Sequence, residues 1–292
     1  MAGQDTLILY SDYNTIQTKI ESVLGTGSGN QGYGQSVSSS LVAQNAKISV
    51  TQWNNLRSDI IRCRQHQTGV APSLTQPTTS VKIYESDRAA YLAEADLAFT
   101  NRLVAPPSGE ATREYLSFGS IQRTSNWNGV RTQTVTITFT DANAARYFFN
   151  TGSRIEFSGS RTGGLGTAKD SSWTTLLSTM GTVYFNYDVT TSTGSGTGSN
   201  IGFYDLTTSS QKIFQKDTTS PTYTPNSYQI WASAPSSTTI QFIIYFRDDS
   251  APGGWGVDED VTGTLTSDVK VYRASGSNVS VNLPAATSSG IV

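Results

Sequence analysis

Strict alternation of apolar and hydroxyl side chains over residues 131–140 is the feature that most constrains the fold of this chain. Val135, Ile137 and Phe139 fall on one face of the segment, and threonines occupy the other. A period of two with β-branched residues is typical of a strand that buries one face. The segment therefore predicts a half-buried strand, and it needs a sheet around it.

The residues that follow predict two short helices and two more strands. Asp141 is expected to cap a helix over 142–149, and Asp170 a second helix that ends at Gly181. The apolar side chains of the second helix have the spacing of one helical face: Trp173, Leu176, Leu177 and Met180. Strands are expected at 154–158 and 182–187. Residues 131–188 thus predict a β-α-β-α-β unit in which short helices cover one face of a sheet.

The first third of the chain contains an internal repeat. Residues 8–20 align with residues 48–60, and each copy predicts a helix after a capping hydroxyl, Ser11 or Thr51. The apolar stripes of the two helices are Tyr13, Ile16, Ile20 and Val23 in the first, and Trp53, Leu56, Ile60 and Cys63 in the second. Such stripes bury against each other or against a neighbouring subunit. Either outcome would suit a protein that assembles.

A long Gly/Ser/Gln-rich loop, residues 25–40, separates the repeats, with Tyr33 and Val37 as its only anchors. Loops of that length are uncommon in compact domains unless they are disordered or bind a partner. Ser86 is expected to cap a third helix over 87–103, which the proline pair after it stops. These features give three regions: a helical repeat region over 1–71, a connector with a helix over 72–110, and a β-rich domain over 111–292.

The rest of the chain is strand-like. Strands are expected at 201–206, 211–215, 228–232, 238–247 and 262–273. Residues 241–246 are apolar on both faces, which predicts a central strand. The tail, 278–292, is expected to be loose. The fold class predicted is α+β, with a helical N-terminal region followed by a β-rich domain with short covering helices.

Composition excludes several classes of function. Only 14% of the residues are charged and the net charge is −2, so the basic patch that nucleic acid or an anionic membrane requires is not expected. No apolar run approaches ~18 residues, so no membrane insertion is expected. The N-terminus has no signal-peptide pattern, and we expect the chain to be made in a cytoplasm. Its single cysteine excludes an internal disulfide.

Candidate chemical motifs favour structural interpretations. Cys63 and His66 have a metal-ligand spacing, but two ligands cannot complete a tetrahedral zinc site, and Cys63 falls on an apolar stripe. The glycine loop over 163–169 precedes a helix but lacks a phosphate-loop signature. Asp258 and Asp260 could form an acid/base pair, although hairpin loops collect Asp and Gly for conformational reasons. We therefore predict no catalytic residues, no metal and no cofactor.

Two segments resemble a known family. Residues 52–60 with 66–69, and residues 145–157 with 162–170 and Trp173, resemble signatures in virion structural proteins of contractile-tailed bacteriophages, especially those that infect marine cyanobacteria. The resemblance covers much of residues 1–188 and brings no catalytic residues with it. It implies a component of the virion, in the tail, neck or baseplate.

The resulting hypothesis is a non-enzymatic virion protein, homo-oligomeric or present in several copies, whose partners are other virion proteins and copies of itself. The alternatives are a receptor-binding tail module that recognises a host surface glycan, a capsid decoration protein, and a glycan hydrolase that uses Asp258 and Asp260. The candidate residues for protein or glycan contact are Trp255, Tyr272 and Tyr33.

Overall fold

A computed structural model describes residues 8–250 and 256–292. The chain forms two compact units. Unit 1 consists of Met1–Thr112, Arg146–Ser153 and Arg273–Asn282, and unit 2 of Arg113–Ala145, Arg154–Tyr272 and Leu283–Val292. Helices come first along the chain and antiparallel sheets follow, so the predicted α+β class is confirmed. Unit 1 takes in the predicted regions 1–71 and 72–110 and adds two later segments.

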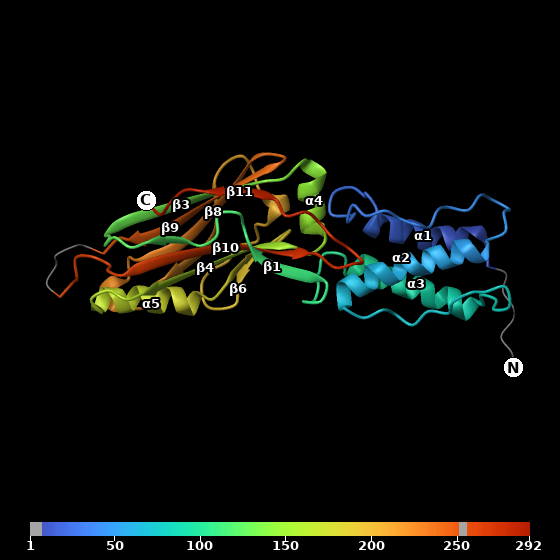
Figure 1. Cartoon of the computed structure of the whole chain (residues 1–292), viewed down its shortest axis with the longest axis horizontal. Helices are drawn as coiled ribbons and strands as arrows, with labels where there is room; N and C mark the ends of the chain where they lie inside the picture. Colours follow the sequence, from blue (N-terminus) through green and yellow to red (C-terminus); the bar gives the residue numbers. More distant parts are fainter. Residues whose placement is uncertain (1–7, 251–255) are drawn as a thin grey trace. The chain divides into compact units, whose positions relative to one another are not determined.

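Unit 1 is built on three helices that run in the same direction (Figure 1). The helices are α1 (Tyr10–Leu24), α2 (Val50–Thr68) and α3 (Glu85–Thr100). Near their N-terminal ends the rings of Tyr13, Trp53 and Tyr91 form two successive edge-to-face contacts, with centroids 5.3 and 5.2 Å apart. Towards the other end, Gln67 of α2 donates to the carbonyl of Ala98 in α3. The N-terminal ends of the helices therefore contact one another, and so do the C-terminal ends of α2 and α3, which means that the helices are parallel.

The parallel arrangement explains the long loops of unit 1. A chain that leaves one helix and enters the next in the same direction must first return along the whole helix, at about 1.5 Å per helical residue. The return segment after α1 is held by α2: both carboxylate oxygens of buried Asp59 accept hydrogen bonds from the amides of Ser38 and Ser39. The loop that we expected to be disordered or to bind a partner is thus held by its own chain.

Both predicted apolar stripes are buried within unit 1. Every residue of the two stripes is at most 5% exposed, and Gly25 and Gly69 follow the two helices as predicted. The predicted capping residues Ser11 and Thr51 are wrong, because the helices begin earlier, with Leu9 and Ser49 as N-caps. Ser49 accepts a bond from the Gln52 amide, which gives α2 a side-chain cap that the repeat alignment had obscured.

Unit 2 contains two antiparallel sheets (Figure 1). The first has the order β1-β10-β4-β5-β6, with β2 also paired to β10, and the second has the order β11-β3-β9-β8-β7. The strands of the first sheet are β1 (Ala111–Tyr115), β2 (Ile121–Arg123), β4 (Arg154–Thr162), β5 (Val183–Phe185), β6 (Thr190–Ser192) and β10 (Thr264–Ala274). Those of the second are β3 (Gly129–Thr138), β7 (Gln211–Asp217), β8 (Ser227–Ser236), β9 (Thr239–Asp248) and β11 (Ala285–Ser288). The remaining helices among the described residues are α4 (Ala142–Asn150), α5 (Ala168–Met180), and the 3₁₀ turns Phe203–Asp205 and Pro221–Tyr223.

The two sheets of unit 2 pack their apolar faces together. Phe242 of β9 contacts the ring of Phe157 in β4 and that of Phe185 in β5, with centroids 5.0 and 5.1 Å apart. Helix α5 adds Trp173, which contacts Phe246 of β9 at 6.4 Å. The predicted apolar face of this helix is buried throughout. The N-cap of α5, however, is Thr167 and not Asp170. Asp170 is the third residue of the helix, and its amide donates to the Thr167 hydroxyl in a capping box.

The predicted β-α-β-α-β unit is wrong about sheet membership. Its strands and helices exist, but β3 pairs with β9 and β11, whereas β4 pairs with β10 and β5. The partners of β3 lie far along the sequence, so local patterning could not assign it to a sheet. The central position of β9 is confirmed. Its burial alternates, however, so only one face is covered and the other is half-exposed.

Two further expectations about the C-terminal half are corrected. The strand expected at 201–206 is a 3₁₀ turn at Phe203–Asp205. The tail expected to be loose is pinned by β3: β11 pairs with it, and Val292 and Thr132 exchange two backbone hydrogen bonds of 2.9 and 3.0 Å. Regular pairing therefore orders a segment whose composition alone indicated a loose end.

Candidate binding surface

The outer face of the five-stranded sheet is rich in amides and hydroxyls and holds one aromatic pair. Trp231 of β8 and Tyr245 of β9 lie diagonally across neighbouring strands, with ring centroids 6.4 Å apart. The indole Nε1 of Trp231 donates to Gln229 on the same strand at 3.1 Å. Both rings are half-buried, so each keeps part of its surface open to solvent. An amphipathic ring beside fixed amides is a common contact for polar ligands.

A β-bulge in β7 extends this face to the edge of the sheet. The register between β7 and β8 shifts between Lys212 and Phe214. The extra residue places Lys212 on the outer face, where strict alternation would have turned it inward. Lys212 lies opposite Trp231, and Gln215 lies opposite Gln229. The aromatic pair and the edge of β7 thus share one continuous surface.

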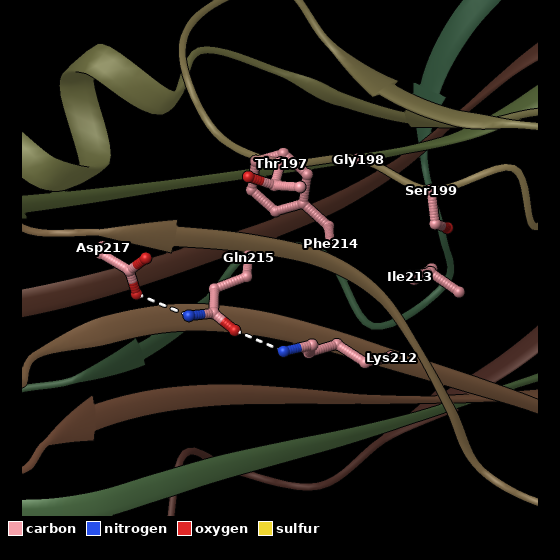
Figure 2. A pocket seen from close by; sticks show the side chains of 8 residues that line it. All are labelled: Thr197, Gly198, Ser199, Lys212, Ile213, Phe214, Gln215 and Asp217. Carbon is pink, nitrogen blue, oxygen red and sulfur yellow. Dashed lines mark hydrogen bonds between the residues drawn. The ribbon is translucent and has the colours of Figure 1, made fainter.

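Three side chains of β7 are joined in a row on that surface. Lys212 Nζ donates to Gln215 Oε1 at 2.6 Å, and Gln215 Nε2 donates to Asp217 Oδ1 at 2.7 Å (Figure 2). The row carries one positive and one negative charge, with an amide between them. It therefore offers donors and acceptors without a net charge.

A cavity of about 260 Å³ lies at this edge. Its lining combines the row on β7 with an aromatic ring and a hydroxyl-bearing loop (Figure 2). The lining residues are Thr197, Gly198, Ser199, Lys212, Ile213, Phe214, Gln215 and Asp217. The hydroxyl Oγ of Ser199 is buried and has no hydrogen-bond partner among the residues that the structure describes. The cavity therefore combines polar and apolar lining groups.

The loop wall of the cavity is fixed by backbone pairing. Thr197 and Gln215 exchange two backbone hydrogen bonds of 2.7 and 2.9 Å, and Thr190 and Ser199 exchange two more. Gly196 has a φ of +139°, and a Cβ atom there would lie 2.4 Å from the ring of Phe214. Glycine is therefore needed for the loop to approach this ring. The wall is in place before any ligand arrives.

Of the three predicted contact residues, the structure describes Tyr33 and Tyr272, and both are buried. Tyr33 is 1% exposed in the core of unit 1, where its hydroxyl donates to the Arg102 carbonyl and accepts from Gln67. Tyr272 is 9% exposed. Trp255 lies outside the described residues. The burial of Tyr33 leaves its ring no surface for a partner, and its pKa is raised strongly by that burial.

Tyr272 belongs to a stack of rings and cations in unit 2. The Arg154 guanidinium lies 4.0 Å from the centroid of Tyr184 and 4.6 Å from that of Tyr272. Arg113 covers Tyr272 at 5.4 Å, and buried Glu156 pairs with both arginines. Burial raises the pKa of Tyr272, and the two arginines oppose that rise. The ring is thus already covered by cations of its own unit.

The two acidic residues considered for catalysis are engaged in structural contacts. Asp258 Oδ2 accepts hydrogen bonds from the Lys169 amide at 2.9 Å and from the Tyr223 hydroxyl at 2.8 Å. The amide of Lys169, followed by the Tyr223 hydroxyl, lowers the pKa of Asp258. Asp260 accepts a bond from the side-chain amide of Asn128. The structure does not bring these carboxylates together in the cavity described above.

The glycine loop before α5 also binds its own chain. The amide of Leu165 donates to Thr262 Oγ1 at 2.8 Å, and the amide of Gly166 donates to Asp170 Oδ2 at 3.1 Å. An anion would have to displace a carboxylate to reach the amide of Gly166. This geometry agrees with the structural interpretation of the loop.

His66 and Cys63 lie in the core of unit 1. Both are 0% exposed, and the ring of His66 meets that of Tyr33 edge to face at 5.2 Å. Nε2 of His66 lies 3.1 Å from the carbonyl oxygen of Thr151. Burial lowers the pKa of His66 to about 4 and raises that of the Cys63 thiol. In the part of the chain that the structure describes, no group of three or more His, Cys, Asp and Glu could hold a metal ion.

Sequence reasoning missed the outer face and its cavity. The alternation of Gln229 and Trp231 in one strand, and of Gln241 and Tyr245 in the next, would have indicated a face with exposed rings and amides. No sequence signal announces the bulge at Lys212, because bulges depend on the partner strand.

Comparisons with known proteins return no relative. No family model, curated protein or solved structure matches the chain. Among residues 8–250 and 256–292, no helix has the length and apolar character needed to cross a membrane.

Proposed function

We propose that this chain is a non-enzymatic structural component of a phage virion, acting in assembly or attachment within the tail, neck or baseplate. It is made in the host cytoplasm and incorporated in several copies beside other virion proteins. The observation that carries the proposal is the role of the residues behind the family resemblance. Within unit 1 these residues hold the backbone together.

Arg146 and Asn150, from the second resembling segment, bind the loop after α1. The Arg146 guanidinium donates to the carbonyls of Thr26 and Gln31 at 2.8 and 2.6 Å. Asn150 Nδ2 donates to three carbonyls of the same loop, at 3.0 to 3.2 Å. Side chains that donate several hydrogen bonds to backbone carbonyls in this way make the loop rigid. A rigid support is what an assembly component requires.

The first resembling segment has a similar role. Trp53 lies between Tyr13 and Tyr91 in the aromatic contacts of the three-helix arrangement, and Asp59 anchors the return segment. The helix stripes are filled by contacts within unit 1, so of the two arrangements expected for them, burial against each other rather than against a neighbouring subunit is the one observed. Exposed apolar side chains are the better candidates for assembly contacts. In unit 1 they include Leu9, Leu41, Val70 and Tyr84, each at least half exposed.

The test is to locate the protein on intact particles. Purified particles made from the genome that encodes this chain would be labelled with a monospecific antibody and imaged by electron microscopy. Label on the tail, neck or baseplate is the expected result. Label on the head would select capsid decoration instead. Particles that lack the protein altogether, together with a purified chain that stays monomeric and does not bind them, would overturn the proposal.

A further inference from the structure

We propose that the cavity at the β7 edge binds one neutral sugar residue of an oligosaccharide, and that Trp231 supports the next residue of the chain. The inference goes beyond the proposed structural function and does not depend on it. It assigns glycan recognition to the outer face of the five-stranded sheet rather than to Tyr272 or Trp255. The observations that carry it are the size, lining and preformed wall of the cavity, together with the continuity of its lining with the Trp231 ring.

The volume suits a single pyranose ring. The cavity of about 260 Å³ has room for roughly eight or nine waters at about 30 Å³ each. It lies just below the ~300–1,000 Å³ of pockets that hold drug-sized ligands. A hexose with its hydroxyl groups is a ligand of this scale. Longer glycans would have to continue outside the cavity, over the sheet.

The lining offers hydrogen-bonding groups of the kinds that sugar hydroxyls use. Lys212 donates, Asp217 accepts, and Gln215 does both, in a row along one strand. On the opposite wall, the exposed Thr197 adds a hydroxyl group. The Phe214 ring is 1% exposed beneath Gly196, so it supports the loop wall and does not stack on the sugar.

The charges in the cavity favour a neutral ligand. Lys212 and Asp217 are linked through Gln215, so each charge is balanced along the row. A carboxylate on the sugar would be attracted by Lys212 and repelled by Asp217, and an ammonium would experience the reverse, so neither gains net attraction from the row. Either group would be bound less well than a hydroxyl, which can donate and accept. We therefore infer that neutral hexoses are preferred over uronic or sialic acids.

The platform beside the cavity completes the site. Lys212 lies directly opposite Trp231 in the strand register, so the indole is the next group across the outer face. Strands are spaced by about 4.8 Å, which is close to the length of one sugar residue. Trp231 is held by its bond to Gln229. A fixed ring exposes an apolar surface with little loss of side-chain entropy on binding.

The opposite sheet provides an internal contrast. Its aromatic residues Tyr184 and Tyr272 are covered by Arg154 at 4.0 and 4.6 Å. A sugar would have to displace that guanidinium to stack on either ring. No cation lies over Trp231 among the contacts of the described residues. Stacking on Trp231 therefore requires no guanidinium to be displaced.

The experiment uses the full chain labelled with fluorotryptophan and observed by fluorine NMR. The Trp231→Phe variant assigns the Trp231 resonance. Maltose, cellobiose, lactose, mannobiose and chitobiose are each titrated to millimolar concentrations. At least one of them is expected to shift the Trp231 resonance, while the resonances of the buried Trp127 and Trp173 stay in place. Sialyllactose is expected to bind no more tightly than lactose.

Variants on the exposed row then test the cavity itself. Lys212→Ala and Gln215→Ala should each weaken the best sugar by about tenfold or more, a change of about 1.4 kcal/mol. Gln241→Ala makes the same amide deletion on the same face, two strands from β7, and should leave the affinity unchanged. The proposal is overturned if none of the five sugars shifts Trp231, if the row variants bind like Gln241→Ala, or if sialyllactose binds more tightly than lactose.

Discussion

The ammonium group of Lys169 lies 2.9 Å from Oδ2 of Asp248, and both side chains are fully buried in unit 2. The pair joins the first turn of α5 to the end of β9. Lys169 also donates to the carbonyl of Glu259 at 3.0 Å, and Asp248 accepts a bond from the Ser250 hydroxyl at 2.6 Å. A buried ion pair is tolerated when its remaining hydrogen-bond donors and acceptors also have partners, although the desolvation of both charges limits its net contribution to stability.

Breaking this pair from one side should be costly. Lys169→Met leaves the Asp248 carboxylate buried without its cation, and we expect a loss of about 3–5 kcal/mol in the free energy of unfolding. The double variant Lys169→Met/Asp248→Asn removes both charges and should lose much less than the sum of the two single changes. Denaturant unfolding, monitored by tryptophan fluorescence, measures the free energy of unfolding of each variant. Lys212→Met, which removes an exposed lysine of the same unit, is the matched control. Additivity within about 0.5 kcal/mol would show that the two groups are not coupled.

Asn150 offers a test of how unit 1 holds its first loop. Its Nδ2 donates to the carbonyls of Gly29, Gln31 and Gly32, and its side chain is 1% exposed. Asn150→Ala should lower the free energy of unfolding by about 1–3 kcal/mol. Asn150→Asp should cost more, because it places a carboxylate oxygen against three carbonyl oxygens.

Hydrogen–deuterium exchange of residues 31–35 gives a local measure of that loss. The amides of Tyr33 and Gly34 donate to the carbonyls of Val23 and Gly25, so they are protected while the loop is in place. Their exchange should accelerate in both Asn150 variants and stay at the wild-type rate in Asn200→Asp, a change at an exposed site. Equal protection in Asn150→Asp and wild type would contradict the assigned role.

The local sequence pattern was sufficient to predict which face each helix buries. It was not sufficient to predict the direction of neighbouring helices or the segments that they contact. The stripe that contains Tyr13 and the stripe that contains Trp53 are buried as the periodicity predicts. Periodicity defines the face that a helix buries, but it carries no information about whether neighbouring helices are parallel. The parallel arrangement converts a long polar loop into a return segment, with Asp59 as its anchor. A single carboxylate within a helix pattern gives no sign of that role.

The candidate binding surface shows the same limit at the level of a site. The outward position of Trp231 can be read from alternation, but the position of Lys212 beside it depends on a bulge that only the pairing with β8 defines. The opposite wall of the cavity comes from a Thr/Ser/Gly loop without hydrophobic anchors. Its backbone pairing with Gln215 gives it a fixed place that composition could not predict.

The thiol of Cys63 should be inert in the native protein. It is 0% exposed within unit 1, and burial, followed by the nearby Asp59 charge, raises its pKa. Thiolate is the reactive form, so a disulfide reagent such as dithiobis-nitrobenzoate should label the thiol only when unit 1 opens. The fully denatured chain, with its single cysteine, should release one equivalent of the coloured thiolate from the reagent and serves as the control. Rapid stoichiometric labelling without denaturant would contradict the burial of this side chain.

His66 should make the stability of unit 1 depend on pH. Its ring is 0% exposed and donates from Nε2 to the Thr151 carbonyl at 3.1 Å as the neutral tautomer. Burial lowers the pKa from its ordinary 6.5 to about 4. Below pH 6.5 the unfolded chain therefore binds a proton that the folded chain excludes until about pH 4. The contribution of neutral His66 to the free energy of unfolding is fully present above pH 6.5 and decreases as the pH falls from 6.5 to 4. Below pH 4 it changes no further, and the total loss is about 3 kcal/mol.

The comparison with His66→Gln isolates this contribution. Glutamine keeps a side-chain N–H donor for Thr151 but does not titrate, whereas the carboxylates of the chain titrate equally in both proteins. Urea unfolding followed by the helical circular dichroism signal reports mainly on unit 1, where α1, α2 and α3 lie. The difference between the two free energies of unfolding should be constant above pH 6.5 and should change steadily in favour of the variant from pH 6.5 to 4. A difference that stays constant across this window would mean that His66 takes up its proton equally in the folded and unfolded chain.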